Sequence, residues 1–164
     1  MLVGSLALSV GFAIYDLTVR EIDLSAAASQ SQYAIYAADT GVECALYWDS
    51  KYGGTGTAFG TSSASTWGSD VICNAQNIAA LGTPPTPVAA LPTGWSAWTI
   101  TSTASAATTT FTLTMLPAQP YCAVVNVGKV TLGGILYTTV ISKGYNNCGV
   151  SGAARLERTL KVSY

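Results

Sequence analysis

Residues 1–52, MLVGSLALSVGFAIYDLTVREIDLSAAASQSQYAIYAADTGVECALYWDSKY, decide the fold of this chain. The stretch contains no proline, and its first 15 residues carry no charge. Apolar residues recur at helical spacing on both sides of a small-residue segment at 25–31. Gly53, Gly54 and Gly56 follow and favour a helix end near Tyr52. The sequence therefore predicts one helix about 75 Å long, at 1.5 Å per residue.

A helix of this length cannot be buried in a domain of 164 residues, so part of it must project. We expect the apolar half, residues 1–24, to project into a membrane or a filament core. We expect residues 25–52 to pack against the rest of the chain, residues 53–164, which form a β-rich head. The face that should contact the head is Tyr33, Ala37, Thr40, Cys44, Tyr47 and Trp48.

The head shows the alternation and turn signals of an antiparallel sheet. Strands are predicted at 97–103, 108–116, 122–130, 135–143 and 156–164, with a short strand or turn at 70–73. Gly133 and Gly134 give a hairpin signal between two of them. Residues 55–69 are expected to form a polar loop, and 81–92, with four of the six prolines, an extended linker. The predicted class is α+β, a long N-terminal helix packed on an antiparallel sheet.

Charge is scarce and unevenly distributed. Only 9% of residues are charged and 49% are hydrophobic, against about 25% charged in ordinary soluble domains. Residues 1–52 hold six acidic and two basic residues, a net charge of −4. Residues 53–164 hold two acidic and five basic residues, a net charge of +3. Either this is chance in a small sample, or the acidic helix and the basic head attract each other within or between subunits.

The four cysteines predict two disulfides and an oxidising compartment, because the chain has a charge-poor, secreted-looking composition and no CxxC motif. Three pairings are open to four cysteines. We expect Cys44–Cys73, which ties the helix to the loop that leaves it, and Cys122–Cys148. With a turn near Gly133, Cys122 lies across from about residue 144, and Cys148 can fold back toward it.

Catalytic and ligand-binding signals are weak. The chain has no histidine to activate its many serines and threonines, and Asp39 and Glu43, four residues apart, are more simply a solvated helix face. No EF-hand spacing joins Asp49, Asp70, Asn146 and Asn147. We therefore predict no enzyme, metal or cofactor. The tryptophans favour core or subunit contacts over a sugar-binding platform, and five bases in the head do not predict specific nucleic-acid binding.

Two segments carry a resemblance to a known family. Ser31–Asp49, SQYAIYAADTGVECALYWD, resembles the helix of bacterial type IV pilin-like proteins. The segments 144–148, GYNNC, and 155–164, RLERTLKVSY, resemble the closing strands of the same proteins. The resemblance covers the whole chain in layout and about 35 residues in motif.

This resemblance implies a structural subunit of an extracellular pilus-like filament on the bacterial surface, with adhesion, motility or DNA uptake as downstream roles. In that family a leader is removed, the new N-terminus is methylated, and the helix holds the subunit in the inner membrane before the pilus assembly machinery adds it to a helical homo-oligomer. The family usually has a glutamate at the fifth mature position, where this chain has Ser5. We expect residues before Met1.

On this reading two groups of residues mediate assembly. The expected filament-core residues are apolar: Met1, Leu2, Val3, Leu6, Leu8, Val10, Phe12 and Ile14. The expected intersubunit charge contacts join Asp39 and Glu43 of one copy to Arg155, Arg158 and Lys161 of another. Two alternatives stay open: a minor or tip pilin with an adhesive, ligand-binding head, and a membrane-anchored secreted enzyme or sugar-binding module.

Overall fold

The structure is a computed structural model that describes residues 2–51, 58–61, 71–74, 76–78, 98–115, 120–148 and 155–164. Met1, the predicted linker at 81–92 and most of the predicted loop at 55–69 lie outside these residues. The side chains of residues 2, 3 and 5–7 also lie outside the description, and they include three of the expected filament-core residues, Leu2, Val3 and Leu6.

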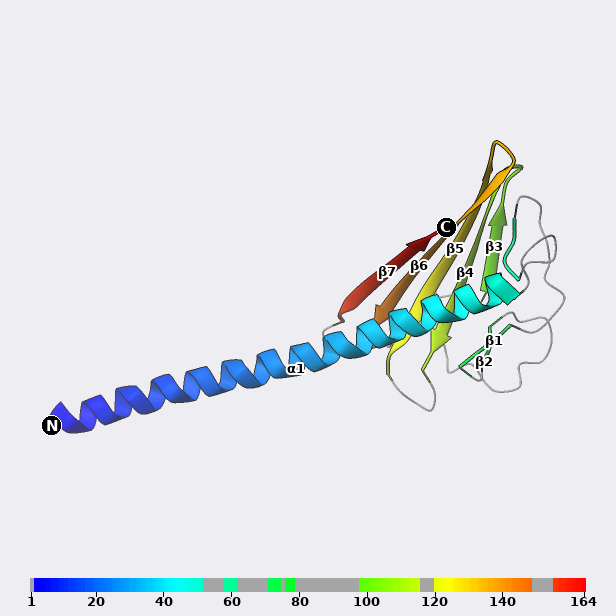
Figure 1. Cartoon of the computed structure of the whole chain (residues 1–164). Helices are drawn as coiled ribbons and strands as arrows, with labels where there is room; N and C mark the ends of the chain where they lie inside the picture. Colours follow the sequence, from blue (N-terminus) through cyan, green and yellow to red (C-terminus); the bar gives the residue numbers. More distant parts are fainter. Residues whose placement is uncertain are drawn as a thin grey trace.

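One helix, α1 (Leu2–Lys51), runs through the first third of the chain. Its N-terminal half projects alone, and its C-terminal half crosses one face of a sheet (Figure 1). The absence of proline and the alanine-rich middle allow the helix to continue without a break. The predicted long helix, packed on an antiparallel sheet, is confirmed.

The head is a five-stranded antiparallel meander in the order β3-β4-β5-β6-β7. A second, two-stranded sheet pairs β1 (Ile72–Cys73) with β2 (Gln76–Asn77). The α+β class is confirmed. The five strands predicted between 97 and 164 have their counterparts in the large sheet, and the short strand or turn predicted at 70–73 overlaps β1. Those strands are β3 (Trp98–Ser102), β4 (Ala106–Thr114), β5 (Cys122–Leu132), β6 (Ile135–Tyr145) and β7 (Glu157–Ser163).

The long hairpin of β5 and β6 turns at Gly133 and Gly134, as predicted. Leu132 pairs with Ile135, which leaves the two glycines as the loop. Their φ angles are +59° and +83°, the left-handed values that a two-residue hairpin turn requires and that glycine adopts without strain. The neighbouring β4–β5 pairing keeps Phe111 opposite Val125 and Leu113 opposite Ala123, all on the face toward α1.

The core lies between α1 and this face of the sheet. Phe111, Leu113 and Met115 are buried there, as the alternation in this strand predicts. Phe59 stacks on Phe111 with the ring centroids 5.9 Å apart. Trp48 lies near the C-terminal end of α1 and donates a hydrogen bond from Nε1 to the Ile72 carbonyl at 3.0 Å. Its burial places it in the core.

The helix face that contacts the sheet has smaller side chains than predicted. Ala37, Cys44 and Trp48 are buried on it, but Tyr33 and Tyr47 are exposed. The contact is made instead by small residues: Ala34, Ala37, Ala38, Gly41 and Ala45. A Cβ on Gly41 would lie 2.7 Å from Val125 Cγ2, so the side chains of the sheet leave no room for a side chain at this position of the helix. The predicted face is correct at Tyr33, whose ring stacks on Tyr121 of the head with the centroids 5.2 Å apart. It was wrong at Tyr47, which contacts Trp48 and Lys51 of α1, because close packing selected small residues against the sheet.

Candidate assembly surface

The projecting half of α1 exposes a continuous series of large apolar side chains, and we call residues 8–24 the stem. Leu8 is 73% exposed and Phe12 is 71% exposed. Soluble monomers rarely leave a contiguous apolar surface of this kind uncovered. The stem therefore needs a partner surface. Its exposed large apolar residues are Leu8, Val10, Phe12, Ile14, Tyr15, Leu17, Val19, Ile22 and Leu24.

Charges divide the stem. Asp16 and Arg20 form an ion pair of 3.2 Å between successive helical turns, and both side chains are largely exposed. Glu21 and Asp23 follow. Within the described residues, α1 contains no segment that combines the length and hydropathy of a membrane-spanning helix.

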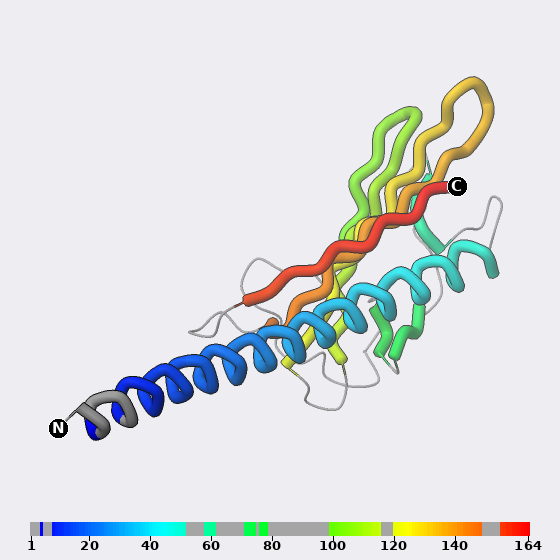
Figure 2. Tube along the Cα trace, turned by 60° about the vertical axis from the view of Figure 1, so that its left-hand side comes forward, coloured from blue at the N-terminus to red at the C-terminus, as the bar shows by residue number. Residues whose placement is uncertain are grey.

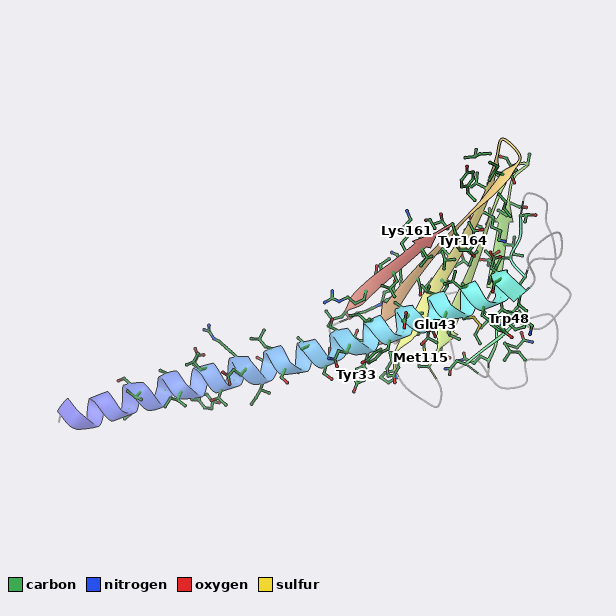
Figure 3. All side chains as sticks on the ribbon, viewed as in Figure 1. Tyr33, Glu43, Trp48, Met115, Lys161 and Tyr164 are labelled. Carbon is green, nitrogen blue, oxygen red and sulfur yellow. A yellow bond between two sulfur atoms is a disulfide. The ribbon has the colours of Figure 1, made fainter. Side chains whose placement is uncertain are left out.

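The carboxylates predicted to contact other subunits lie on the helix surface. Asp39 and Glu43 are exposed, and neither has an ion-pair partner within the described part of its own chain. Lys161 lies on β7 at the sheet edge, while Glu43 lies on α1 (Figure 3). These groups are therefore accessible to a neighbouring copy.

The two arginines of the predicted charge contacts are already used within the subunit. Arg158 Nε donates a hydrogen bond to Ser31 Oγ at 2.9 Å. The Arg155 guanidinium lies over the Tyr145 ring, 3.9 Å from its centroid. Both residues remain exposed. Among the three predicted cations, Lys161 is the one without a described partner in its own chain.

Polar contacts fix the head to α1 just past the C-terminal end of the stem. Asn146 Nδ2 donates to Gln30 Oε1 at 2.9 Å, next to the Arg158–Ser31 bond. Asn146 Oδ1 in turn accepts a hydrogen bond from the Leu156 amide at 2.7 Å. The last strand and the segment before it are thus tied to the middle of α1, and Figure 2 shows β7 running beside the helix.

Both predicted disulfides are present. Cys44 pairs with Cys73 and Cys122 with Cys148, with Cα–Cα distances of 5.8 and 5.9 Å, and no described cysteine is free. The first joins α1 to β1, and the second joins β5 to the segment after β6. The first bridge therefore ties the helix to the small sheet, and the second ties the large sheet to the segment that leaves it.

A buried polar cluster near the C-terminal end of α1 was not predicted. Asp49 on α1 contacts the Lys129 amine on β5, and their side chains are only 6% and 2% exposed. Tyr164 donates a hydrogen bond from its hydroxyl to Asp49 Oδ2 at 2.7 Å. Burial, followed by this hydrogen bond and the Asp49 charge, raises the pKa of the Tyr164 hydroxyl.

The sequence contained a signal for this cluster. Ala123, Val125, Val127 and Lys129 alternate along β5, so a strict period of two places Lys129 on the buried face with the three apolar residues. The local sequence does not pair Lys129 with Asp49, because the two residues lie on different elements. The attraction between acidic helix and basic head is realised here within one subunit.

The end of the β5–β6 hairpin forms a second exposed apolar surface. It extends beyond the helix at the opposite end of the molecule from the stem (Figure 1). The residues are Val130, Leu132, Ile135, Leu136 and Tyr137. Within the described residues, no group of His, Cys, Asp and Glu has an arrangement that could hold a metal ion.

Comparison with known proteins adds no relative to this picture. No protein-family model, no curated protein and no solved structure matches the chain. The helix, sheet and disulfides are compatible with a pilin-like fold, and the functional argument therefore depends on the molecule's own surfaces.

Proposed function

We propose that this chain is a structural subunit of an extracellular filament of the type IV pilus kind, assembled by packing the stems of many copies. The observation that carries the proposal is the exposed apolar stem on an otherwise well-packed α+β head. Side-by-side packing with equivalent stems covers this surface and repeats along an axis. The chain is then a structural protein, and its precursor is held at the inner membrane.

Several features of the head fit this role. Two disulfides and a small fraction of charged residues suit an extracellular particle. The small-residue segment at 25–31 permits close approach of neighbouring helices where the stem meets the head. The exposed Asp39, Glu43 and Lys161 can set the register between copies, although each surface ion pair contributes little binding energy.

The experiment that tests the proposal is assembly of the full chain after detergent removal. Phe12→Glu places a charge on the stem and should abolish filaments, while circular dichroism and both disulfides remain as in the wild type. Thr101→Glu, on an exposed position of β3, adds the same charge outside the stem and should assemble normally. Normal filaments from Phe12→Glu would refute assembly through the stem.

A second candidate function is favoured by the apolar hairpin end. In a minor or tip pilin, the head binds another molecule, and the exposed Leu132, Ile135 and Tyr137 supply a surface for such contact. Stoichiometry in purified filaments separates the two roles. A major subunit accounts for most of the filament mass, whereas a tip subunit is present in a few copies.

A further inference from the structure

Asp49 and Lys129 lie in contact inside the core, at the junction of α1 with β5. Lys129 Nζ touches Asp49 Oδ1, yet Oδ1 accepts no hydrogen bond, so the contact lacks the geometry of an ordinary hydrogen-bonded ion pair. The other carboxylate oxygen, Oδ2, accepts the Tyr164 hydroxyl proton at 2.7 Å. An amine, a carboxyl group and a hydrogen-bond donor on that carboxyl group therefore meet in one site, where the Lys129 and Asp49 side chains are buried and the Tyr164 side chain is partly exposed.

We propose that Lys129 and Asp49 join in an intramolecular amide bond after the chain folds. This inference is independent of the proposed filament, because it depends only on the folded head. Condensation of an amine with a carboxylic acid needs no oxidant or reductant. The residues of the site supply both reactants.

The chemistry balances within the site. A proton passes from the Lys129 ammonium to Asp49 Oδ1, which gives the neutral amine and the neutral acid that an amide condensation requires. Nζ then attacks Cγ, and negative charge develops on Oδ2, where the Tyr164 hydroxyl donates its hydrogen bond. The Cγ–Oδ1 bond then breaks. Oδ1, which already carries one proton, takes a second proton from Nζ and leaves as water, and the amide remains.

The arrangement favours this reaction over reaction at other lysines. Lys143 contacts Glu157 at 3.2 Å, but both side chains are more than 40% exposed, so water competes and both charges stay solvated. Lys129 and Asp49 are held in place by the packed helix and sheet, which removes the entropy cost of bringing the two groups together. Burial and fixed geometry thus distinguish this pair.

The amide would change how the helix is fastened to the head. It would join the C-terminal end of α1 to the middle strand of the sheet, and the Cys44–Cys73 bridge lies nearby on the same helix. Force applied along α1 pulls the helix across the sheet. A covalent bond at Asp49 would keep the two layers together after hydrogen bonds and apolar contacts had yielded.

The test is the intact mass of the full chain after denaturation and disulfide reduction. The amide form is lighter than the sequence mass by one water molecule. Tryptic digestion should leave Lys129 uncleaved and give a branched peptide that joins 21–51 to 52–143. Lys129→Met should have its full calculated mass. Tyr164→Phe should raise the uncrosslinked fraction, whereas Tyr137→Phe, on the exposed hairpin, should match the wild type.

A wild-type mass equal to that of the full sequence overturns the proposal, without recourse to any variant. A lost water that maps to a dehydrated aspartate elsewhere in the chain, with Lys129 cleaved normally, also overturns it. Persistence of the mass deficit in Lys129→Met would exclude Lys129 as the amine. The branched peptide at Asp49 and Lys129 is the result that supports the bond.

Discussion

Gly144 on β6 lies against the backbone of Ala34 in α1, with no room for a side chain between them. A Cβ on Gly144 would overlap the Ala34 carbonyl oxygen and lie 2.9 Å from the Ala38 Cβ. The backbone of the helix and that of the sheet are therefore in direct contact at this point. This contact sets how closely the packed half of α1 approaches the head.

Gly144→Ala should therefore destabilise the folded chain. The added methyl meets rigid backbone rather than a flexible side chain, and overpacking of this kind costs about 1–3 kcal/mol. Denaturant unfolding of the full chain in mild detergent measures the loss. Gly128→Ala is the matched control, because its Cβ would lie 3.8 Å from the nearest atom, the Thr139 carbonyl oxygen. Equal stability of the two variants would contradict the close contact.

Removing the helix disulfide should weaken the head. The double change Cys44→Ser and Cys73→Ser avoids a free thiol and opens a loop with a sequence separation of 29 residues. In the chain-entropy description, a loop of this size contributes about 3 kcal/mol. The urea midpoint should fall. An unchanged midpoint would show that α1 and β1 are held together without the bridge.

The sheet edge should lose a small part of its stability in acid. A hydrogen bond from Tyr145, aided by Lys143 and Thr159, lowers the pKa of Glu157 from its ordinary value of 4.5. Because the folded-state pKa is the lower one, the contribution is present above the unfolded value and is lost as pH falls through the folded value. The Glu157 side chain is 41% exposed, so the effect is below about 1 kcal/mol.

The Glu157→Gln variant measures the stability that the Glu157 carboxylate contributes. The difference in unfolding midpoint between wild type and variant should shrink as the pH falls from neutral to values below 4.5, because the lowered pKa of Glu157 places its protonation there. Glu43→Gln, which changes an exposed carboxylate without a described partner, serves as the control. A Glu157→Gln difference that stays constant across this range would argue against the Tyr145–Glu157 interaction.

Charge reversal should reveal the contact between neighbouring copies. Lys161→Glu should weaken filaments, and Glu43→Lys in the same chain should partly restore them. Lys161 is a better reporter than Arg158, because Arg158 is bonded to Ser31 within its own subunit. Sedimentation of assembled material at low and high salt measures the effect, since the Debye length falls to about 3 Å at 1 M. Filaments insensitive to both changes would show that the stem alone sets assembly.

The features that depend on local sequence pattern could be predicted from the sequence. The helix, the hairpin at Gly133 and Gly134 and both disulfides follow from spacing, turn residues and chain reach. The exposed Tyr47 was wrongly placed against the head because helical periodicity alone does not reveal how closely a sheet approaches. Gly41 and Gly144 show that approach, but each is remote in sequence from its partner.

The buried pair was missed for a related reason. Alternation along β5 marks Lys129 as inward-facing, but its partner, Asp49, is 80 residues away on a different element. Only the crossing of α1 over the sheet brings the two groups together. A contact between side chains of the helix and the sheet therefore cannot be predicted from the local sequence. The apolar stem can be predicted, because its residues are consecutive.

The most direct test of the account is electron cryo-microscopy of the assembled full chain. We predict helical filaments in which the stems of neighbouring copies pack around the axis, with Leu8 and Phe12 buried among them and the heads outside. Filaments whose stems face solvent, or an assembly held together by heads alone, would contradict the claim that the stem is the assembly surface.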